Sequence, residues 1–156
     1  MVFYLIYTSK PRVPMTPEVV EDITKASIRN NLRDDITGML LAIEGHYLQF
    51  LEGNEKKVLA LLEVIKSDVR HKDLIVWVMG FQEHRIFTEW SMGSWMLSNE
   101  ELTKLSALED ISDFIKNPQN ADMQSIKFLS MMNSLLKTWI AHEPERSKKL
   151  REGMSN

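Results

Sequence analysis

ITGMLLAIEGHYLQFLEG, residues 36–53, contains two short apolar runs that meet at a single glycine. The runs 36–44 and 46–52 have the length and composition of β-strands. Gly45 lies between them and can adopt the positive φ that a tight hairpin turn requires. The segment is therefore predicted to be a β-hairpin, which Gly53 and Asn54 end.

A strand and a helix are predicted before the hairpin. Residues 2–8 (VFYLIYT) are β-rich and unbroken, and a loop rich in proline follows them. Thr16 can cap a helix whose first position is Pro17, and apolar residues then recur at helical spacing until Asn30-Asn31 breaks the pattern. The first helix is therefore predicted to end at this asparagine pair.

A second helix and two further strands are predicted after the hairpin. Residues 55–69 carry an apolar stripe at helical spacing with charged residues on the opposite side, and residues 74–81 and 87–95 are strand-like. The order strand, helix, strand, strand, helix, strand, strand is that of an α+β fold. It predicts a ferredoxin-like sandwich in which a mixed five-stranded sheet carries two helices on one face.

The character of the sequence changes near residue 95, after which it is helix-like only. Residues 97–114 and 123–140 predict C-terminal helices, which we expect to cap the other face of the sheet. The last residues lack apolar periodicity and predict a flexible tail. The expected organisation is a core of residues 1–95, a helical cap of residues 96–141 and a tail of residues 142–156.

The overall composition excludes several classes of function. The 156 residues are 44% hydrophobic and 26% charged, as in one globular domain, and 19 Lys and Arg against 22 Asp and Glu argue against nucleic acid as a direct partner. The lack of cysteine excludes disulfides and thiolate chemistry, and the four histidines lack metal-ligand spacing. We expect no signal peptide, because the apolar run near residue 2 is short and no basic region precedes it. No apolar run approaches the about 20 residues of a membrane span, and we find no phosphate loop or nucleophile motif. We expect a cytoplasmic protein without a metal, and not a conventional enzyme.

Three polar features are candidates for a functional site. Tyr7 shares the parity of Phe3 and Leu5 and is expected to be buried, either as an ordinary core phenol or as an electron and proton donor. Gln49 lies within an apolar strand and either faces water on an edge strand or bridges a phenol and a ligand. Asn30-Asn31 is either a plain helix terminus or a pair of amides placed to bind a heterocycle.

Taken together, six segments in order resemble the BLUF family, the flavin-based sensors of blue light. The resemblance runs from about residue 2 to residue 95. The matching segments are LIYTS (5–9), RNN (29–31), ITGML (36–40), YLQFLEG (47–53), DVRH (68–71) and RIFTEWSM (85–92). The fold of that family agrees with the order of strands and helices predicted above.

The resemblance implies a flavin, normally FAD with FMN or riboflavin as alternatives, bound non-covalently between the two core helices. By the same resemblance, Tyr7 is the photo-oxidised donor, Gln49 is the switching amide, and Trp90 and Met92 are the mobile pair that transmits the signal. The positions matching the flavin-binding residues of the family are Asn31, Asn30, Ile23, Ser27, Ile65, Asp68, Arg70 and His71. Apolar packing and a solvated helix end are the alternatives for several of them.

Two positions depart from the family pattern, and the implied function is sensory. Asp35 stands where relatives often have glycine, and Val64 where some have a basic residue. The resemblance implies a light-driven hydrogen-bond switch whose output is protein–protein, through a homo-oligomer or a separate downstream protein, as in short BLUF proteins. The alternative is a ferredoxin-like interaction module that has lost flavin, and a flavin-dependent redox enzyme is a third possibility.

Overall fold

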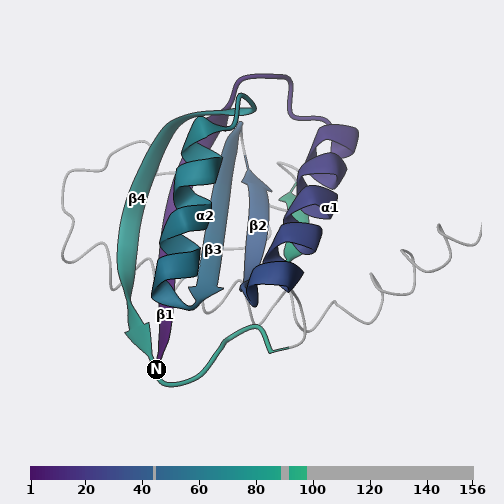
Figure 1. Ribbon diagram of the computed structural model, residues 1–156. Coiled ribbons are helices and arrows are strands. Elements are labelled where there is room, and N and C mark those ends of the chain that lie inside the picture. The colour runs from purple at the N-terminus through teal and green to yellow at the C-terminus, as the bar shows by residue number, and fades with distance from the viewer. Residues whose placement is uncertain (44, 89–91, 98–156) are drawn as a thin grey trace, which may run out of the picture. The chain divides into compact units, whose positions relative to one another are not determined.

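The computed structural model describes residues 1–43, 45–88 and 92–97, drawn as coloured ribbon in Figure 1. The predicted C-terminal helices and tail lie outside the described residues, apart from residues 96 and 97, which end the last strand and so correct the predicted start of the helical cap. The elements are β1 (Val2–Pro11), α1 (Pro17–Asp34), β2 (Thr37–Ile43), β3 (His46–Gly53), α2 (Glu55–Ser67), β4 (His71–Gln82) and β5 (Gly93–Leu97).

The five strands form one mixed sheet in the order β4-β1-β3-β2-β5. The pairs β1–β4, β1–β3 and β2–β3 are antiparallel, and β2–β5 is parallel. Both α1 and α2 lie on the same face of this sheet (Figure 1). The predicted ferredoxin-like sandwich of five strands and two helices is thereby confirmed.

Helix α1 begins as the sequence predicts but ends later. Thr16 caps it with its side-chain oxygen, which accepts a hydrogen bond from the Val19 backbone N–H at 3.3 Å, and Pro17 occupies the first turn. The prediction that Asn30-Asn31 ends the helix is wrong, because the helix continues to Asp34. The left-handed residue that ends it is Asp35, with φ of 55°, a conformation that short polar side chains tolerate.

Helix α2 packs an apolar stripe on the sheet. Asn54 caps its start, and Val58 and Leu62 are buried against the strands. The helix ends at Ser67, two residues before the predicted end, and the chain leaves it in an extended conformation at Asp68. Because α2 ends here, Asp68, Arg70 and His71 lie beside residues of both helices.

Strand register decides which side chains face the helices. Tyr7 pairs with Gln49 across β1 and β3, and Leu5 pairs with Leu51, so these four side chains share the helix-facing side. The edge-strand interpretation of Gln49 is wrong, because β3 lies between β1 and β2 and the residue is 4% exposed. The opposite parity is also apolar and buried, and comprises Ile6, Met39, Leu41, Ile43, Leu48 and Phe50.

The last predicted strand begins later than expected. A strand was predicted over residues 87–95, but Phe87, Thr88 and Met92 are not in a strand, and β5 covers Gly93–Leu97. The physical reason is that the Phe87 backbone N–H donates to the Glu52 carboxylate at 2.7 Å and so is not available to a strand ladder. Pairing with β2 starts only at Gly93, opposite Met39.

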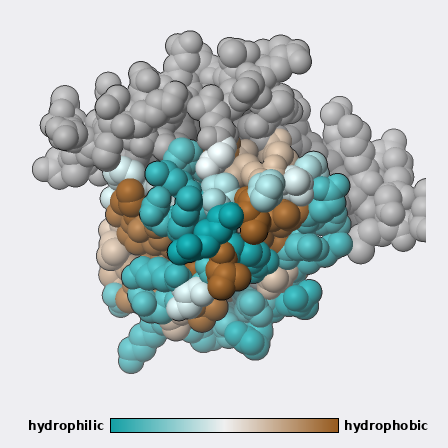
Figure 2. Space-filling model, turned by 90° about the horizontal axis from the view of Figure 1, so that it is seen from above, coloured by the Kyte–Doolittle hydropathy of each residue, from teal (hydrophilic) through white to brown (hydrophobic). Residues whose placement is uncertain are grey.

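Figure 2 looks onto the end of the domain where β1 and α2 end and α1 begins. Hydrophobic side chains on this face form small patches separated by hydrophilic ones. Single apolar side chains among polar ones are common on protein surfaces, and this face carries no large apolar patch. No helix in the described part of the chain is long and apolar enough to cross a membrane.

Candidate functional site

The centre of the site is a hydrogen bond between Tyr7 and Gln49. The register of β1 and β3 places the two residues opposite each other on the helix-facing side, and the Tyr7 hydroxyl donates to Gln49 Oε1. Tyr7 has no accessible surface and Gln49 is 4% exposed. The two polar groups that the sequence singled out separately therefore form one buried pair.

Met92 extends this pair toward β5. Gln49 Nε2 donates to Met92 Sδ at 3.6 Å, and Met92 is buried immediately before the strand begins. The amide of Gln49 thus joins a phenol on β1 to a thioether on the connection into β5. Trp90 lies outside the described residues.

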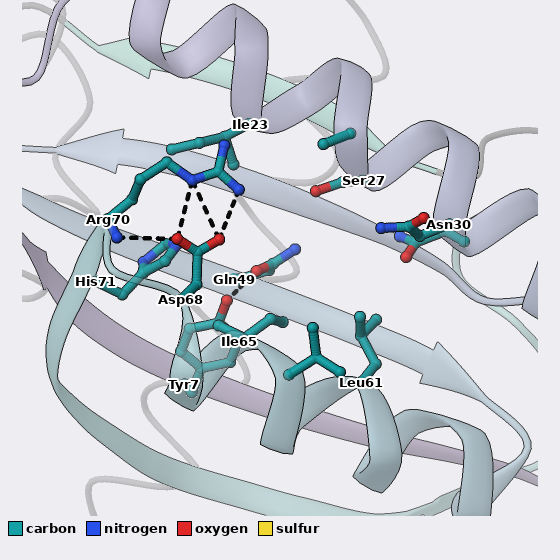
Figure 3. A pocket seen from close by; sticks show the side chains of 13 residues that line it. Tyr7, Ile23, Ser27, Asn30, Gln49, Leu61, Ile65, Asp68, Arg70 and His71 are labelled. Atoms are coloured by element: carbon teal, nitrogen blue, oxygen red, sulfur yellow. Dashed lines mark hydrogen bonds and ion pairs between the residues drawn. The ribbon is translucent and has the colours of Figure 1, made fainter.

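A cleft between the two helices opens above this pair (Figure 3). Ile23 and Ser27 come from α1, Ile65 comes from α2, and Asp68 and Arg70 follow the end of α2. All the flavin-contact residues expected from the sequence line this cleft together with Tyr7 and Gln49, and Met92 is linked to it through Gln49. The lining residues are Tyr7, Ile23, Ala26, Ser27, Asn30, Asn31, Gln49, Leu61, Val64, Ile65, Asp68, Arg70 and His71.

Ala26 and Leu61 line the cleft although the sequence analysis did not assign them to a site. Their spacing could have identified them, since residues three or four apart share one face of a helix. Ala26 lies three residues after Ile23, and Leu61 lies four residues before Ile65. Val64 also lines the cleft and contributes an apolar side chain there.

An ion pair lies at the end of the cleft where α2 terminates. Arg70 donates to the Asp68 carboxylate from Nε at 3.0 Å and from Nη2 at 2.5 Å. The Arg70 hydrogen bond holds the pKa of Asp68 below its usual range, and Asp68 in turn raises the pKa of Arg70. Both side chains are only partly exposed, so they are held in the cleft rather than spread in solvent.

His71 lies deeper, beneath this ion pair. Its Nδ1 is 2.9 Å from Ser9 Oγ, and the edge of its ring meets the ring of Tyr47. Burial lowers the pKa of His71 below its usual value, although the nearby Asp68 charge opposes the shift. The imidazole is therefore neutral near pH 7, and Arg70 is the cationic side chain in the cleft lining.

The environment of Tyr7 favours its neutral phenol. Burial, and after it the negative charge of Asp68, raises the pKa of Tyr7 well above its usual value. A neutral phenol that loses an electron becomes strongly acidic, so oxidation of Tyr7 requires a proton acceptor at the same place. Gln49 Oε1 already accepts the hydrogen bond from that hydroxyl.

The cleft lining contains side chains suited to a flat heterocycle. Its walls are aliphatic, its polar groups include two asparagine amides, and one cation lies at its end. In the part of the chain that the structure describes, no group of three His, Asp or Glu side chains is placed to hold a metal ion. The fold, and a buried phenol–amide–thioether array below such a cleft, agree with the class that the sequence resembles, the small sensory domains that use a flavin.

Comparison with known proteins identifies the family. The family model described as sensors of blue-light using FAD, BLUF, matches residues 2–93. The chain belongs to this family, which confirms both the sensory class and the resemblance found in the sequence.

Curated relatives share the same region. The chain is 32% identical over 108 residues to the photoactivated adenylate cyclase subunit beta of Euglena gracilis, covering 69% of this chain and 12% of that protein. It is 31% identical over 87 residues to the blue light- and temperature-regulated antirepressor BluF of Escherichia coli K12, covering 56% of this chain and 22% of that protein. The chain thus spans between about an eighth and a fifth of the length of these relatives.

Solved structures agree with the fold. A bacterial light-regulated adenylyl cyclase superposes with a TM-score of 0.70 at 32% identity, over 76% of this chain and 35% of that chain. The dark state of the BLUF protein BlrB superposes with a TM-score of 0.67 at 25% identity, over 85% and 96%. The photo-activated state of BlsA, at 24% identity and a TM-score of 0.70 over 87% and 95%, shares the fold.

Proposed function

We propose that this blue-light sensor binds FAD non-covalently in the cleft between α1 and α2 and uses Tyr7 and Gln49 as a light-driven hydrogen-bond switch. The observation that carries the proposal is the buried chain from the Tyr7 hydroxyl through the Gln49 amide to Met92 Sδ. It lies on the sheet side of a cleft whose walls come from the two helices (Figure 3). FAD is chosen over FMN or riboflavin because the family description names it.

The residues present fit a flavin. Ile23 on α1 and Ile65 on α2 provide apolar surfaces for the two sides of a flat ring. Asn30 and Asn31 provide amides for the donors and acceptors of a pyrimidine edge, since an amide both donates and accepts. Ser27 and the cation of Arg70 complete the polar lining, and Asp68 orients that cation.

A bound flavin supplies a blue-light absorber whose excited state takes one electron. Tyr7 is the residue placed to lose that electron, and its proton leaves along the hydrogen bond to Gln49 Oε1. The proton would pass through the Gln49 amide, which takes it on Oε1 and gives one from Nε2 to the flavin that has taken the electron. Gln49 would then remain as its imidic tautomer or rotate its amide. Rotation would end the donation from Nε2 to Met92 Sδ, and the tautomer would keep only one of the two Nε2 hydrogens, so the event at Tyr7 would reach the connection before β5. The electron and the proton return to Tyr7 when the cycle closes.

The output of the switch is a protein–protein signal carried by Trp90, Met92 and β5. β5 lies at one edge of the sheet and pairs only with β2 in the described part of the chain, over the short stretch Gly93–Leu97, whereas the other edge strand, β4, pairs with β1 from Val2 to Pro11. We further propose that residues 98–141 form helices that cover the apolar sheet face opposite α1 and α2, with residues 142–156 as a tail. The signal passes to a second copy of the chain or to a separate protein in the cytoplasm.

The absorption spectrum of the purified protein before and after blue light tests this function. We expect a flavin spectrum that shifts to the red on illumination and returns in darkness with the oxidised band intact. Protein that remains colourless after reconstitution with FAD would contradict the proposal and favour an interaction module without flavin. Flavin that only bleaches under light would favour redox chemistry instead.

A further inference from the structure

Glu52 is a carboxylate buried on the sheet face opposite the cleft. It has no accessible surface, and it lies three residues after Gln49 on β3, so the two side chains point to opposite faces about 10 Å apart along the strand. A buried carboxylate is costly unless several donors surround it. Glu52 therefore needs hydrogen-bond donors other than the side chains of Tyr7 and Gln49.

The partner is the connector of residues 83–88, which follows β4. Glu52 Oε1 accepts from the Phe87 backbone N–H at 2.7 Å, and Oε2 accepts from the Ile86 backbone N–H at 2.9 Å. Gln82 donates to Oε2 at 2.6 Å at the end of β4. Each carboxylate oxygen of Glu52 thus accepts a backbone hydrogen bond from the connector. Hydrogen bonds to an ionised acceptor are stronger than those between two neutral groups.

Arg85 fastens the same connector a second time. It donates from Nη1 to Thr37 Oγ1 at 3.1 Å, and Thr37 Oγ1 donates in turn to Glu52 Oε1 at 2.9 Å. Arg85 Nη2 also donates to the backbone oxygen and the carboxylate of Asp35, at 2.8 and 2.9 Å. Thr37 pairs with Glu52 across β2 and β3, so the whole cluster rests on two central strands.

This cluster limits where the chain around Met92 can move. Phe87 is held by Glu52 and packs its ring on Phe50, and Gly93 is held by its pairing with Met39 on β2. Only residues 88–92 lie between these two anchors. Met92 therefore lies next to one anchor and five residues after the other, so a displacement of Met92 away from Gln49 acts against both anchors and is reversed by them.

We propose that Glu52 is a positioning residue that holds the connector of residues 83–88 and thereby sets how fast the lit state returns to the dark state. The inference rests on the proposed light switch, but the holding of the connector is a property of the dark protein. Glu52 contacts neither the Tyr7–Gln49 pair nor the cleft, so it acts on the lifetime of the lit state and not on the photochemical event.

The test compares Glu52→Gln with wild type in the dark and after a blue-light pulse, using the full chain. In the dark, we expect hydrogen exchange at the amides of Ile86 and Phe87 to accelerate at least about tenfold, as loss of a charge-assisted hydrogen bond predicts. After the pulse, we expect an unchanged red shift with an about fivefold or greater slowing of recovery, because the anchor that returns Met92 to Gln49 is weaker. If Glu52 had only a structural role, Glu52→Gln would accelerate the exchange, and it would either leave the red shift and its recovery rate unchanged or alter both together.

Two further variants control the comparison. Glu55→Gln removes an exposed carboxylate three residues away on α2 and should match wild type in both measurements. Thr37→Val keeps Glu52 but removes the hydroxyl that links it to Arg85. We expect faster exchange and slower recovery than in wild type, with smaller changes than in Glu52→Gln. If Glu52→Gln does not fold, this variant tests the proposal in its place.

The outcomes separate this proposal from the light switch. Wild-type exchange at Ile86 and Phe87 in Glu52→Gln would overturn the anchor, and accelerated exchange with wild-type recovery would overturn its link to the photocycle. Loss of the red shift with flavin still bound would place Glu52 in the photochemical site and so refute a positioning role. If wild type itself shows no light-induced shift, the switch fails and the link to recovery fails with it, while the dark exchange still decides the anchor.

Discussion

Tyr7→Phe removes one oxygen atom below the cleft and leaves the aromatic ring in place. The lost hydroxyl has no accessible surface and donates to Gln49 Oε1, so the change leaves a buried amide oxygen without that donor. The expected cost is about 1–2 kcal/mol of unfolding free energy, which corresponds to a fall of about 2–8 °C in Tm for a chain of this size. The fold and flavin binding should therefore persist.

The light response of this variant should be lost completely. Phenylalanine supplies no hydroxyl proton and is far harder to oxidise than a phenol, so nothing initiates the change at Gln49. The assay is the light-minus-dark absorption spectrum at equal flavin occupancy, together with thermal unfolding in the dark. A reversible red shift of wild-type size in Tyr7→Phe would refute the assigned role of this residue.

Tyr4→Phe is a matched control on the same strand. Tyr4 lies on the opposite face of β1, where its ring stacks on Phe50 at a centroid distance of 5.9 Å. Removing its hydroxyl leaves that stacking and the cleft unchanged, so this variant should keep a normal photocycle. Loss of the light response in both variants would show that the assay reports general damage to β1.

Other substitutions test further parts of the site. Gln49→Ala should keep flavin and lose the light response, because the link from Tyr7 to Met92 is removed; a normal photocycle would exclude Gln49 as the switch. The buried hydroxyl of Tyr47 has no hydrogen-bond partner among the described residues. Tyr47→Phe should therefore leave the free energy of unfolding unchanged or raise it by up to about 1 kcal/mol, as measured by chemical denaturation. A fall of more than about 1 kcal/mol would contradict this. His71 has a lowered pKa in the folded protein, so the unfolded chain binds the extra proton first, and stability should fall as pH decreases below about 6.5. His71→Gln should reduce that slope in unfolding curves between pH 7 and 5, and an unchanged slope would show that His71 does not cause it.

Much of the fold was predictable because its signals are local. Alternation in residues 2–8 placed Tyr7 on the parity of Phe3 and Leu5, and the helical stripe in residues 55–69 predicted α2. These periods follow from backbone geometry within a few residues, so they can be read from the sequence before any contact is known. The start of α1 was predictable for the same reason, because a cap acts within one turn.

Other features could not be predicted because they depend on partners distant in the chain. The left-handed Asp35 that ends α1 also accepts hydrogen bonds from Arg85, and β5 begins at Gly93 because Glu52 holds the Phe87 amide. Each of these contacts joins residues that are more than thirty positions apart. No local pattern records such a pairing.

The sequence by itself determined which elements form, which residues of β1 share one face with Tyr7, and which residue types are available for chemistry. Only the tertiary structure decided that Tyr7 lies opposite Gln49, that Gln49 reaches Met92, and that Asp68 pairs with Arg70 at the cleft. The physical reason is that strand order and register arise from packing the whole sheet against two helices. Hydrogen bonds between its side chains exist only once that packing is complete.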